Sequence, residues 1–143
     1  MSEKLIEFEG FKVKVSPENK RGDVILSRPP LNVIEYSQRI KMAEAMRNLD
    51  NDEDVRVIVL RAEGENFSSG GNIEGFMKET PETLTMLAQN VMTPEKLRKP
   101  VIAAITVSTF LLEAMKFRPS SPNKIFVSPK FVPCSLRNIL YEL

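Results

Sequence analysis

The sequence predicts an α/β fold, in which strands and helices alternate along the chain and crossover connections join the strands. Two observations support this prediction. Near the start of the chain, in residues 11–15, apolar residues occupy every second position, which is the pattern of a half-buried strand. Farther along, stretches with helical spacing alternate with short runs of β-branched residues, which is typical of buried strands covered by helices.

The first elements form a predicted β-hairpin. In the segment Phe11–Val15, apolar residues alternate with lysines, and a second short strand begins at Val24–Leu26. Proline, asparagine and glycine between residues 17 and 22 supply the turn. Pro29-Pro30 ends the second strand, because proline has no N–H to donate to a ladder.

Helices and buried strands follow in alternation. The segments Ser37–Leu49 and Pro81–Met92 repeat apolar residues at i, i+3, i+4 and i+7, so we expect a helix over each. The segments Val55–Leu60 and Val101–Ile105 are mostly apolar and rich in β-branched residues. Such runs are typical of strands buried on both faces, and we expect the first of them to be central in a sheet covered by helices.

The chain divides into one predicted folded unit, residues 1–105, and a poorly specified tail, residues 106–143. In the tail, apolar residues follow neither the helical period nor the strand period. We therefore expect the tail to pack irregularly against the folded unit and to form no second domain. Its last 25 residues also hold four of the ten prolines of the chain, Pro119, Pro122, Pro129 and Pro133.

Composition excludes several kinds of chemistry. A chain of 143 residues with 42% apolar and 27% charged residues has the size and composition of one globular domain. It contains no histidine, which excludes Ser-His-Asp catalysis and histidine-ligated zinc. Its single cysteine, Cys134, cannot form an internal disulfide, and we expect no metal site.

Charge and hydropathy argue against two kinds of partner. Twenty basic and nineteen acidic side chains leave a net charge of +1, so we expect no nucleic acid and no anionic membrane as partner. The longest mostly apolar stretch, Val101–Leu112, is too short to span a bilayer. The first ten residues lack the basic start and long apolar run of a signal peptide. The sequence thus predicts a soluble, cytoplasmic protein.

One loop, Arg61–Glu74, has the features of a ligand site. It follows a predicted buried strand, and open α/β sheets bind their ligands at the carboxyl ends of strands. Ser69-Gly70-Gly71 can turn sharply and lets a ligand approach the backbone. If Asn72 opens a short helix, amides near Gly71 can donate to an oxyanion. The alternative is a glycine-rich surface turn followed by an asparagine cap, and spacing alone favours that alternative.

Four segments of the chain together resemble the N-terminal half of the crotonase (enoyl-CoA hydratase/isomerase) superfamily, over residues 11–105. They occur in the order and approximate spacing of that family. The cyclic dienoyl-CoA hydratases are the subgroup that residues 28–33 and 67–72 resemble most. The four segments are Ile25–Asn32, Val55–Arg61, Phe67–Ile73 and Lys99–Ile105.

The resemblance implies a crotonase-like spiral of repeated ββα turns, truncated here and followed by the irregular tail. It also implies assembly into homotrimers or hexamers. The implied substrates are acyl-CoA thioesters, whose enolate is stabilised by two backbone N–H groups. Coenzyme A would enter as part of the substrate, and no separate cofactor is expected.

The same resemblance assigns roles to single residues. The Gly71 backbone N–H would be one oxyanion donor, and the Ser69 backbone would meet the adenine end of CoA. Asn72 stands where the family usually has aspartate. The segment assigned to substrate or CoA binding comprises Ser69, Gly70, Gly71, Asn72, Ile73 and Glu74.

The resemblance ends after Ile105. The family continues with a Gly-Gly-Gly segment that gives the second oxyanion donor and, in hydratases, a catalytic glutamate. Residues 106–115 contain no glycine, and we assign no role to Glu113. Two functions from different classes follow: an acyl-CoA enzyme acting on a cyclic dienoyl-CoA, or a catalytically inactive truncated remnant that binds CoA weakly or binds a partner chain.

A frameshift could account for the remnant. Codons for Leu112–Phe117 can encode Gly-Gly-x-Glu followed by Ile or Val when they are read from the third base. That sequence resembles the missing family segment. The hypothesis is that residues from about 106 onward are a frameshifted end, which the gene sequence tests.

Overall fold

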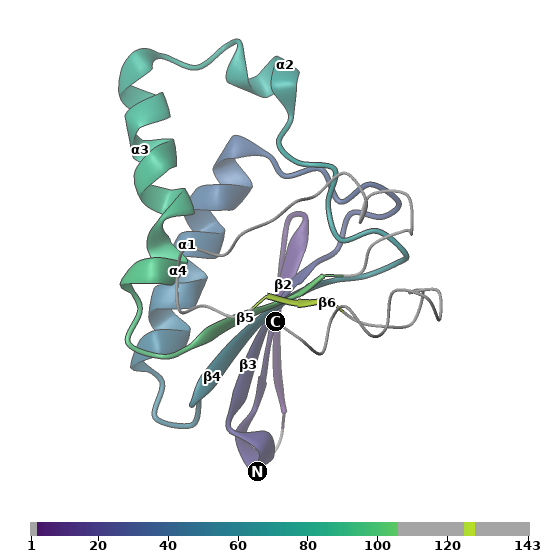
Figure 1. The fold of residues 1–143 in the computed structure, drawn as a ribbon, viewed down its shortest axis with the longest axis vertical. Coiled ribbons are helices and arrows are strands. Elements are labelled where there is room, and N and C mark those ends of the chain that lie inside the picture. The colour runs from purple at the N-terminus through teal and green to yellow at the C-terminus, as the bar shows by residue number, and fades with distance from the viewer. Residues whose placement is uncertain (1–2, 106–124, 128–143) are drawn as a thin grey trace, which may run out of the picture.

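The computed structural model describes residues 3–105 and 125–127 (Figure 1). Six described strands form one sheet in the order β1-β2-β3-β4-β5-β6. The first three strands are antiparallel, and each later strand runs parallel to its predecessor. The strands are β1 (Lys4–Phe8), β2 (Phe11–Ser16), β3 (Arg21–Leu26), β4 (Val57–Ala62), β5 (Val101–Ile105) and β6 (Ile125–Val127).

The predicted hairpin and the predicted parallel strands are confirmed. Strands β2 and β3 pair antiparallel with Phe11 opposite Leu26. Strand β6 continues the sheet beyond β5 by parallel pairing. The rest of the predicted tail, residues 106–124 and 128–143, lies outside the described residues.

Strand β1 is an addition to the predicted fold. Its apolar side chains are largely exposed, with Leu5 57% and Ile6 53% accessible, so burial gave little signal for it. It is held by antiparallel backbone pairing with β2 and by Phe8, which packs against the core. Ion pairs add to this, with Glu7 at 3.6 Å from Lys12 and Glu3, just before the strand, at 2.9 Å from Lys14. Cross-strand pairs of opposite charge stabilise a strand without a hydrophobic period.

Helices α1, α3 and α4 lie together on one side of the sheet, and α2 lies apart from them at the top of the view (Figure 1). Both predicted helices, α1 and α3, are confirmed. Two short helices are also present, α2 before α3 and α4 after it. α1 is the longest and lies over the described strands, while α3 packs beside it. The helices are α1 (Tyr36–Asn51), α2 (Ile73–Phe76), α3 (Pro81–Val91) and α4 (Thr93–Lys96).

Strand β4 differs from its prediction in two ways. Only Ile58, on the helix-covered face, is fully buried, whereas Val57 and Val59 are half-buried, because the described helices cover one face of the sheet. The strand also extends to Ala62, so Arg61 belongs to the sheet and not to the loop. Its guanidinium lies 3.2 Å from the carboxylate of Asp23, which is fully buried.

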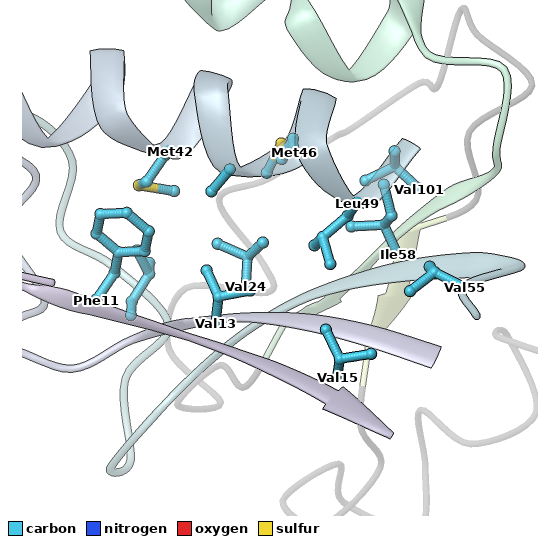
Figure 2. Packing of buried hydrophobic residues seen from close by; sticks show 12 residues of the cluster. Phe11, Val13, Val15, Val24, Met42, Met46, Leu49, Val55, Ile58 and Val101 are labelled. Atoms are coloured by element: carbon cyan, nitrogen blue, oxygen red, sulfur yellow. The ribbon is translucent and has the colours of Figure 1, made fainter. Parts of the chain in front are cut away.

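The core fills the space between α1 and the sheet (Figure 2). The rings of Phe8 and Phe11 stack with centroids 4.6 Å apart. Gly22 lets the helix approach β3, because a Cβ atom there would lie 2.8 Å from a methyl group of Leu49. The buried cluster consists of Phe11, Val13, Val15, Val24, Leu26, Met42, Ala45, Met46, Leu49, Val55, Ile58 and Val101.

The carboxyl end of α1 is tied to the start of β5. The Lys99 ammonium donates to the Leu49 carbonyl at 2.7 Å, where a positive charge complements the helix dipole. Asp50 accepts hydrogen bonds from the Lys99 N–H at 2.9 Å and from Arg98 Nε at 3.3 Å. Burial acts to raise the pKa of Asp50, but these hydrogen bonds outweigh it, so the pKa lies below its ordinary value.

This arrangement predicts a stability loss in acid. Because the pKa of Asp50 is lower in the folded chain than in the unfolded chain, its stabilising effect is present above about pH 4, the ordinary carboxyl range, and is lost as the pH falls through the folded value. Urea unfolding at pH 7 and pH 3 should show a smaller pH effect for Asp50→Asn than for the parent chain. Glu53→Gln, an exposed carboxylate in the following loop, is the matched control and should keep the parental pH dependence.

Candidate functional site

Two loops meet at the carboxyl ends of β3 and β4, where the sequence places the ligand site. The loop after β3 covers residues 27–35, and the loop after β4 covers residues 63–72. They pair through backbone hydrogen bonds: the Ser69 N–H donates to the Leu31 carbonyl and the Ile34 N–H donates to the Gly70 carbonyl, both at 2.9 Å. The predicted site loop is therefore held by a segment more than 30 residues earlier in the chain.

Asn32 holds the two loops together. It is 1% exposed and has a φ of +47°, a left-handed conformation that asparagine tolerates better than most residues. Its side-chain oxygen accepts from the Arg28 N–H at 2.8 Å, and its amide nitrogen donates to the carbonyls of Glu63 and Asn66 at 2.9 and 2.7 Å. Asn32 is the last residue of the family-like segment Ile25–Asn32, but the sequence assigned it no role. Its place after two prolines and a leucine is a turn signal that could have identified it.

The glycine conformation predicted at Ser69-Gly70-Gly71 is present, but the sharp turn is not: residues 69 and 70 form no turn or bend, and Gly71 pairs with Ile34 as a parallel β-bridge. Gly70 has a φ of +106°, a region that only glycine adopts readily, and a Cβ atom there would meet nothing within 4 Å. Backbone conformation, and not lack of space, therefore requires glycine. The Ser68 hydroxyl holds this part of the loop by accepting from the Gly70 N–H at 3.0 Å and donating to the Asn32 carbonyl at 2.8 Å.

The Gly71 N–H points out of this hydrogen-bond network. It shares a trans peptide with the Gly70 carbonyl, and the two groups of such a peptide point in opposite directions. Since that carbonyl accepts from Ile34, the Gly71 N–H is directed away from Ile34. The Asn72 N–H donates to the Ile34 carbonyl at 3.1 Å, which fixes the next peptide. Among residues 3–105 and 125–127, no protein acceptor takes the Gly71 N–H, and Gly71 is half-buried.

Asn72 caps the short helix α2, as expected. Its side-chain oxygen accepts from the Gly75 N–H at 3.3 Å. The helix has only four residues, so its dipole is small and adds little to anion binding. The donor capacity of this loop therefore rests on the Gly71 N–H itself.

The Asn72 side chain also contacts a carboxylate. Its amide nitrogen lies 3.1 Å from each carboxylate oxygen of Glu35, the residue that precedes α1. Arg28 donates to the same carboxylate at 3.2 Å. Nothing in the sequence indicated that Glu35 belongs to this site, because its partner Asn72 lies 37 residues away, and Arg28 joins the site only through Glu35.

The remaining predicted site residues are near the surface. Ser69 is exposed, and its N–H is already used by Leu31, so its carbonyl and hydroxyl are the groups left for a ligand. Ile73 is 77% exposed, and Glu74 is exposed beside it. All six predicted residues thus lie in one continuous segment, from Ser69 to Glu74, at the edge of the two-loop unit.

The described residues include no group of three or more histidine, cysteine, aspartate or glutamate side chains placed to hold a metal ion. Within the same part of the chain, no helix has the length and apolar character needed to cross a membrane.

Known proteins resemble this chain in sequence and in fold. The family model described as enoyl-CoA hydratase/isomerase matches residues 20–109. The probable enoyl-CoA hydratase 1, peroxisomal, of Arabidopsis thaliana is 32% identical over 90 residues, which cover 57% of this chain and 32% of that protein.

Solved structures give the same result. An enoyl-CoA hydratase from Mycobacterium avium subsp. paratuberculosis K-10 superposes with a TM-score of 0.59 at 26% identity, covering 71% of this chain and 40% of that one. A probable enoyl-CoA hydratase from Mycobacterium thermoresistibile has a TM-score of 0.59 at 27% identity, covering 71% and 43%. The chain thus spans between about a third and two fifths of the length of these proteins. With a family model over more than half of its residues and a crotonase-like fold, the chain belongs to the enoyl-CoA hydratase/isomerase family.

Proposed function

We propose that the chain binds acyl-CoA thioesters and that the Gly71 N–H donates a hydrogen bond to the thioester oxygen. The observation that supports this proposal is the orientation of the Gly71 peptide. The carbonyl of this peptide, which belongs to Gly70, accepts a hydrogen bond from the Ile34 N–H. The Gly71 N–H therefore points away from the contacts between the loops, and it has no protein acceptor among the described residues. A fixed N–H of this kind stabilises the oxygen of an enolate, where the charge of the reaction develops.

The segment around Gly71 would hold the rest of the ligand. The Ser69 backbone meets the adenine end of CoA, and Gly71 to Glu74 line the substrate. A cyclic dienoyl-CoA is the substrate we propose, from the resemblance of residues 28–33 and 67–72 to that subgroup. Coenzyme A enters as part of the substrate, and assembly into trimers or hexamers remains a prediction from the family.

Binding without turnover is the second candidate function. Residues 106–115 contain no glycine where the family has the segment that supplies its second donor. Loss of one oxyanion donor costs about 100- to 1,000-fold in rate. The 143-residue chain should therefore hydrate crotonyl-CoA or a cyclic dienoyl-CoA at a rate near background. Robust turnover of either compound would reject this second candidate.

The decisive experiment removes the N–H. Gly71→Pro deletes the donor, whereas Gly71→Ala keeps it and serves as the control. Calorimetry should compare acetoacetyl-CoA, whose enol form resembles the enolate, with CoA. A lost hydrogen bond to a charged oxygen corresponds to about a 10- to 100-fold weaker Kd, so Gly71→Pro should weaken binding of acetoacetyl-CoA by that factor and binding of CoA much less.

Gly71→Ala should bind acetoacetyl-CoA within about threefold of the parent chain, since its backbone donor is intact. Equal losses for acetoacetyl-CoA and CoA in Gly71→Pro would contradict the proposed donor. Absence of binding of both compounds to the parent chain would contradict the proposed function as a whole.

A further inference from the structure

We propose that Glu35 is a positioning residue that fixes the orientation of the Gly71 N–H through Asn72. The inference rests on the proposed function of that N–H and adds a residue outside the loop to the site. Glu35 lies directly before α1, far from Gly71 in the sequence. Its carboxylate contacts the loop one residue after the proposed donor.

The peptides around Gly71 need restraint. Two consecutive glycines have access to more backbone conformations than any other pair, so a flip of the peptide between Gly70 and Gly71 is sterically easy. Such a flip would turn the Gly71 N–H toward Ile34 and abolish the proposed donor. The backbone of Ile34 opposes it by binding the Gly70 carbonyl at 2.9 Å and the Asn72 N–H at 3.1 Å.

Glu35 adds a side-chain restraint at the same place. Both of its carboxylate oxygens lie 3.1 Å from the Asn72 amide nitrogen, and that side chain in turn accepts from the Gly75 N–H at 3.3 Å. Ile34 and Glu35 are adjacent, so one rigid segment holds the loop by its backbone and by its side chain. Asn72 is thereby fixed on both sides, toward α1 and toward α2.

Glu35 itself is well anchored. Its N–H donates to the side-chain oxygen of Gln38 at 3.3 Å, and Gln38, which is 3% exposed, donates to the Gly10 carbonyl at 3.0 Å. Arg28 holds the carboxylate from the other side at 3.2 Å. The carboxylate therefore cannot follow a moving loop without breaking contacts with α1 and with the loop after β3.

The side chains at positions 35 and 72 are complementary, since one is a carboxylate and the other an amide that donates to it. The Asn72 amide donates to the Glu35 carboxylate, whereas an aspartate at position 72 would place two carboxylates in contact, which like charge disfavours. Position 72 is also where this chain has asparagine and the family usually has aspartate. The contact with Glu35 is a physical reason for asparagine at this position.

The test places a carboxylate at position 72 and then moves the amide to position 35. Asn72→Asp should repel Glu35 and release the Gly71 peptide, and the double variant Glu35→Gln with Asn72→Asp should restore one amide and one carboxylate. Glu44→Gln, an exposed carboxylate on α1, is the control. In the ligand-free chain, the ¹⁵N–¹H resonance of Gly71 should shift or broaden in Asn72→Asp, return toward its parental position in the double variant and stay unchanged in Glu44→Gln.

Binding gives the second readout. Asn72→Asp should weaken binding of acetoacetyl-CoA about tenfold more than binding of CoA, and the double variant should recover most of this loss. If the role of the Glu35–Asn72 contact were purely structural, Asn72→Asp would lower the melting temperature and weaken the binding of acetoacetyl-CoA and of CoA equally. That result would overturn the inference. If Asn72→Asp does not fold, Glu35→Gln alone provides the comparison, with a smaller shift of the same resonance expected.

The two readouts separate this inference from the proposed function. If the parent chain binds no acetoacetyl-CoA, the proposed function fails, and the Gly71 resonance alone decides whether Glu35 positions the peptide. A Gly71 resonance that is unaffected by Asn72→Asp, or not restored in a folded double variant, overturns the inference.

Discussion

Replacement of Asn32 by alanine is expected to lower the free energy of unfolding by about 3–5 kcal/mol, since buried groups that lose their partners cost about 1–3 kcal/mol each. The change leaves the Arg28 N–H and the carbonyls of Glu63 and Asn66 without their contacts to the Asn32 side chain. It also places alanine at a φ of +47°, which adds about 1 kcal/mol. Urea unfolding followed by circular dichroism measures the effect.

Asn66→Ala is the matched control, because it removes an amide whose single hydrogen bond, to the Pro30 carbonyl at 3.1 Å, is exposed. Its cost should stay below about 1 kcal/mol. Asn32→Gly separates the two causes, since glycine relieves the backbone conformation but restores no hydrogen bond. Equal destabilisation by Asn32→Ala and Asn66→Ala would show that Asn32 does not hold the loops together.

Replacement of Phe11 by alanine is expected to destabilise the chain by about 3–5 kcal/mol, the usual cost of removing a buried phenylalanine ring. Phe11 is 0% exposed and lies beneath α1 (Figure 2), and its ring stacks on Phe8 at an interplanar angle of 3°. The substitution opens a cavity beneath α1 and removes that stacking contact. Thermal unfolding and urea unfolding should both register the loss.

Two comparisons give this prediction its specificity. Phe11→Leu keeps most of the volume and should cost less than half as much as alanine. Leu5→Ala, on the exposed strand β1, should cost below about 1 kcal/mol because Leu5 is 57% accessible. A loss for Phe11→Ala no larger than that for Leu5→Ala would place the core elsewhere than between β2, β3 and α1.

The two predictions concern different parts of the structure that supports the Gly71 loop. Phe11 stabilises the contact between the sheet and α1, and this contact fixes the position of Glu35 at the start of the helix. Asn32 fixes the loop after β4 against the loop after β3. The Gly71 N–H depends on both, because its loop is held by Ile34 in the backbone and by Glu35 through Asn72.

Local patterns predicted the main elements of the fold. Helices α1 and α3 begin and end close to the predicted ends, because the apolar residues of both repeat with the helical period. In α1 these residues are buried against the sheet, whereas no residue of α3 is buried. Strand β2 was found from its alternation of apolar and polar residues, and β5 from its continuous apolar run, although only Val101 of β5 is buried. Strand β1 was missed, since Leu5 and Ile6 are exposed and the strand is held by its backbone pairing with β2 and by the stacking of Phe8 on Phe11, which form only in the folded chain.

The sequence by itself determined the α/β class, the loop that carries Gly71 and, through four short segments, the family. These features are local, since each depends on residues within one strand, helix or turn. The tertiary structure decided which way the Gly71 N–H points and which residues hold it. Asn32, Glu35 and Ser68 act on partners 31 to 37 residues away, and spacing along the chain carries no information about contacts formed only when β3 and β4 pair in parallel.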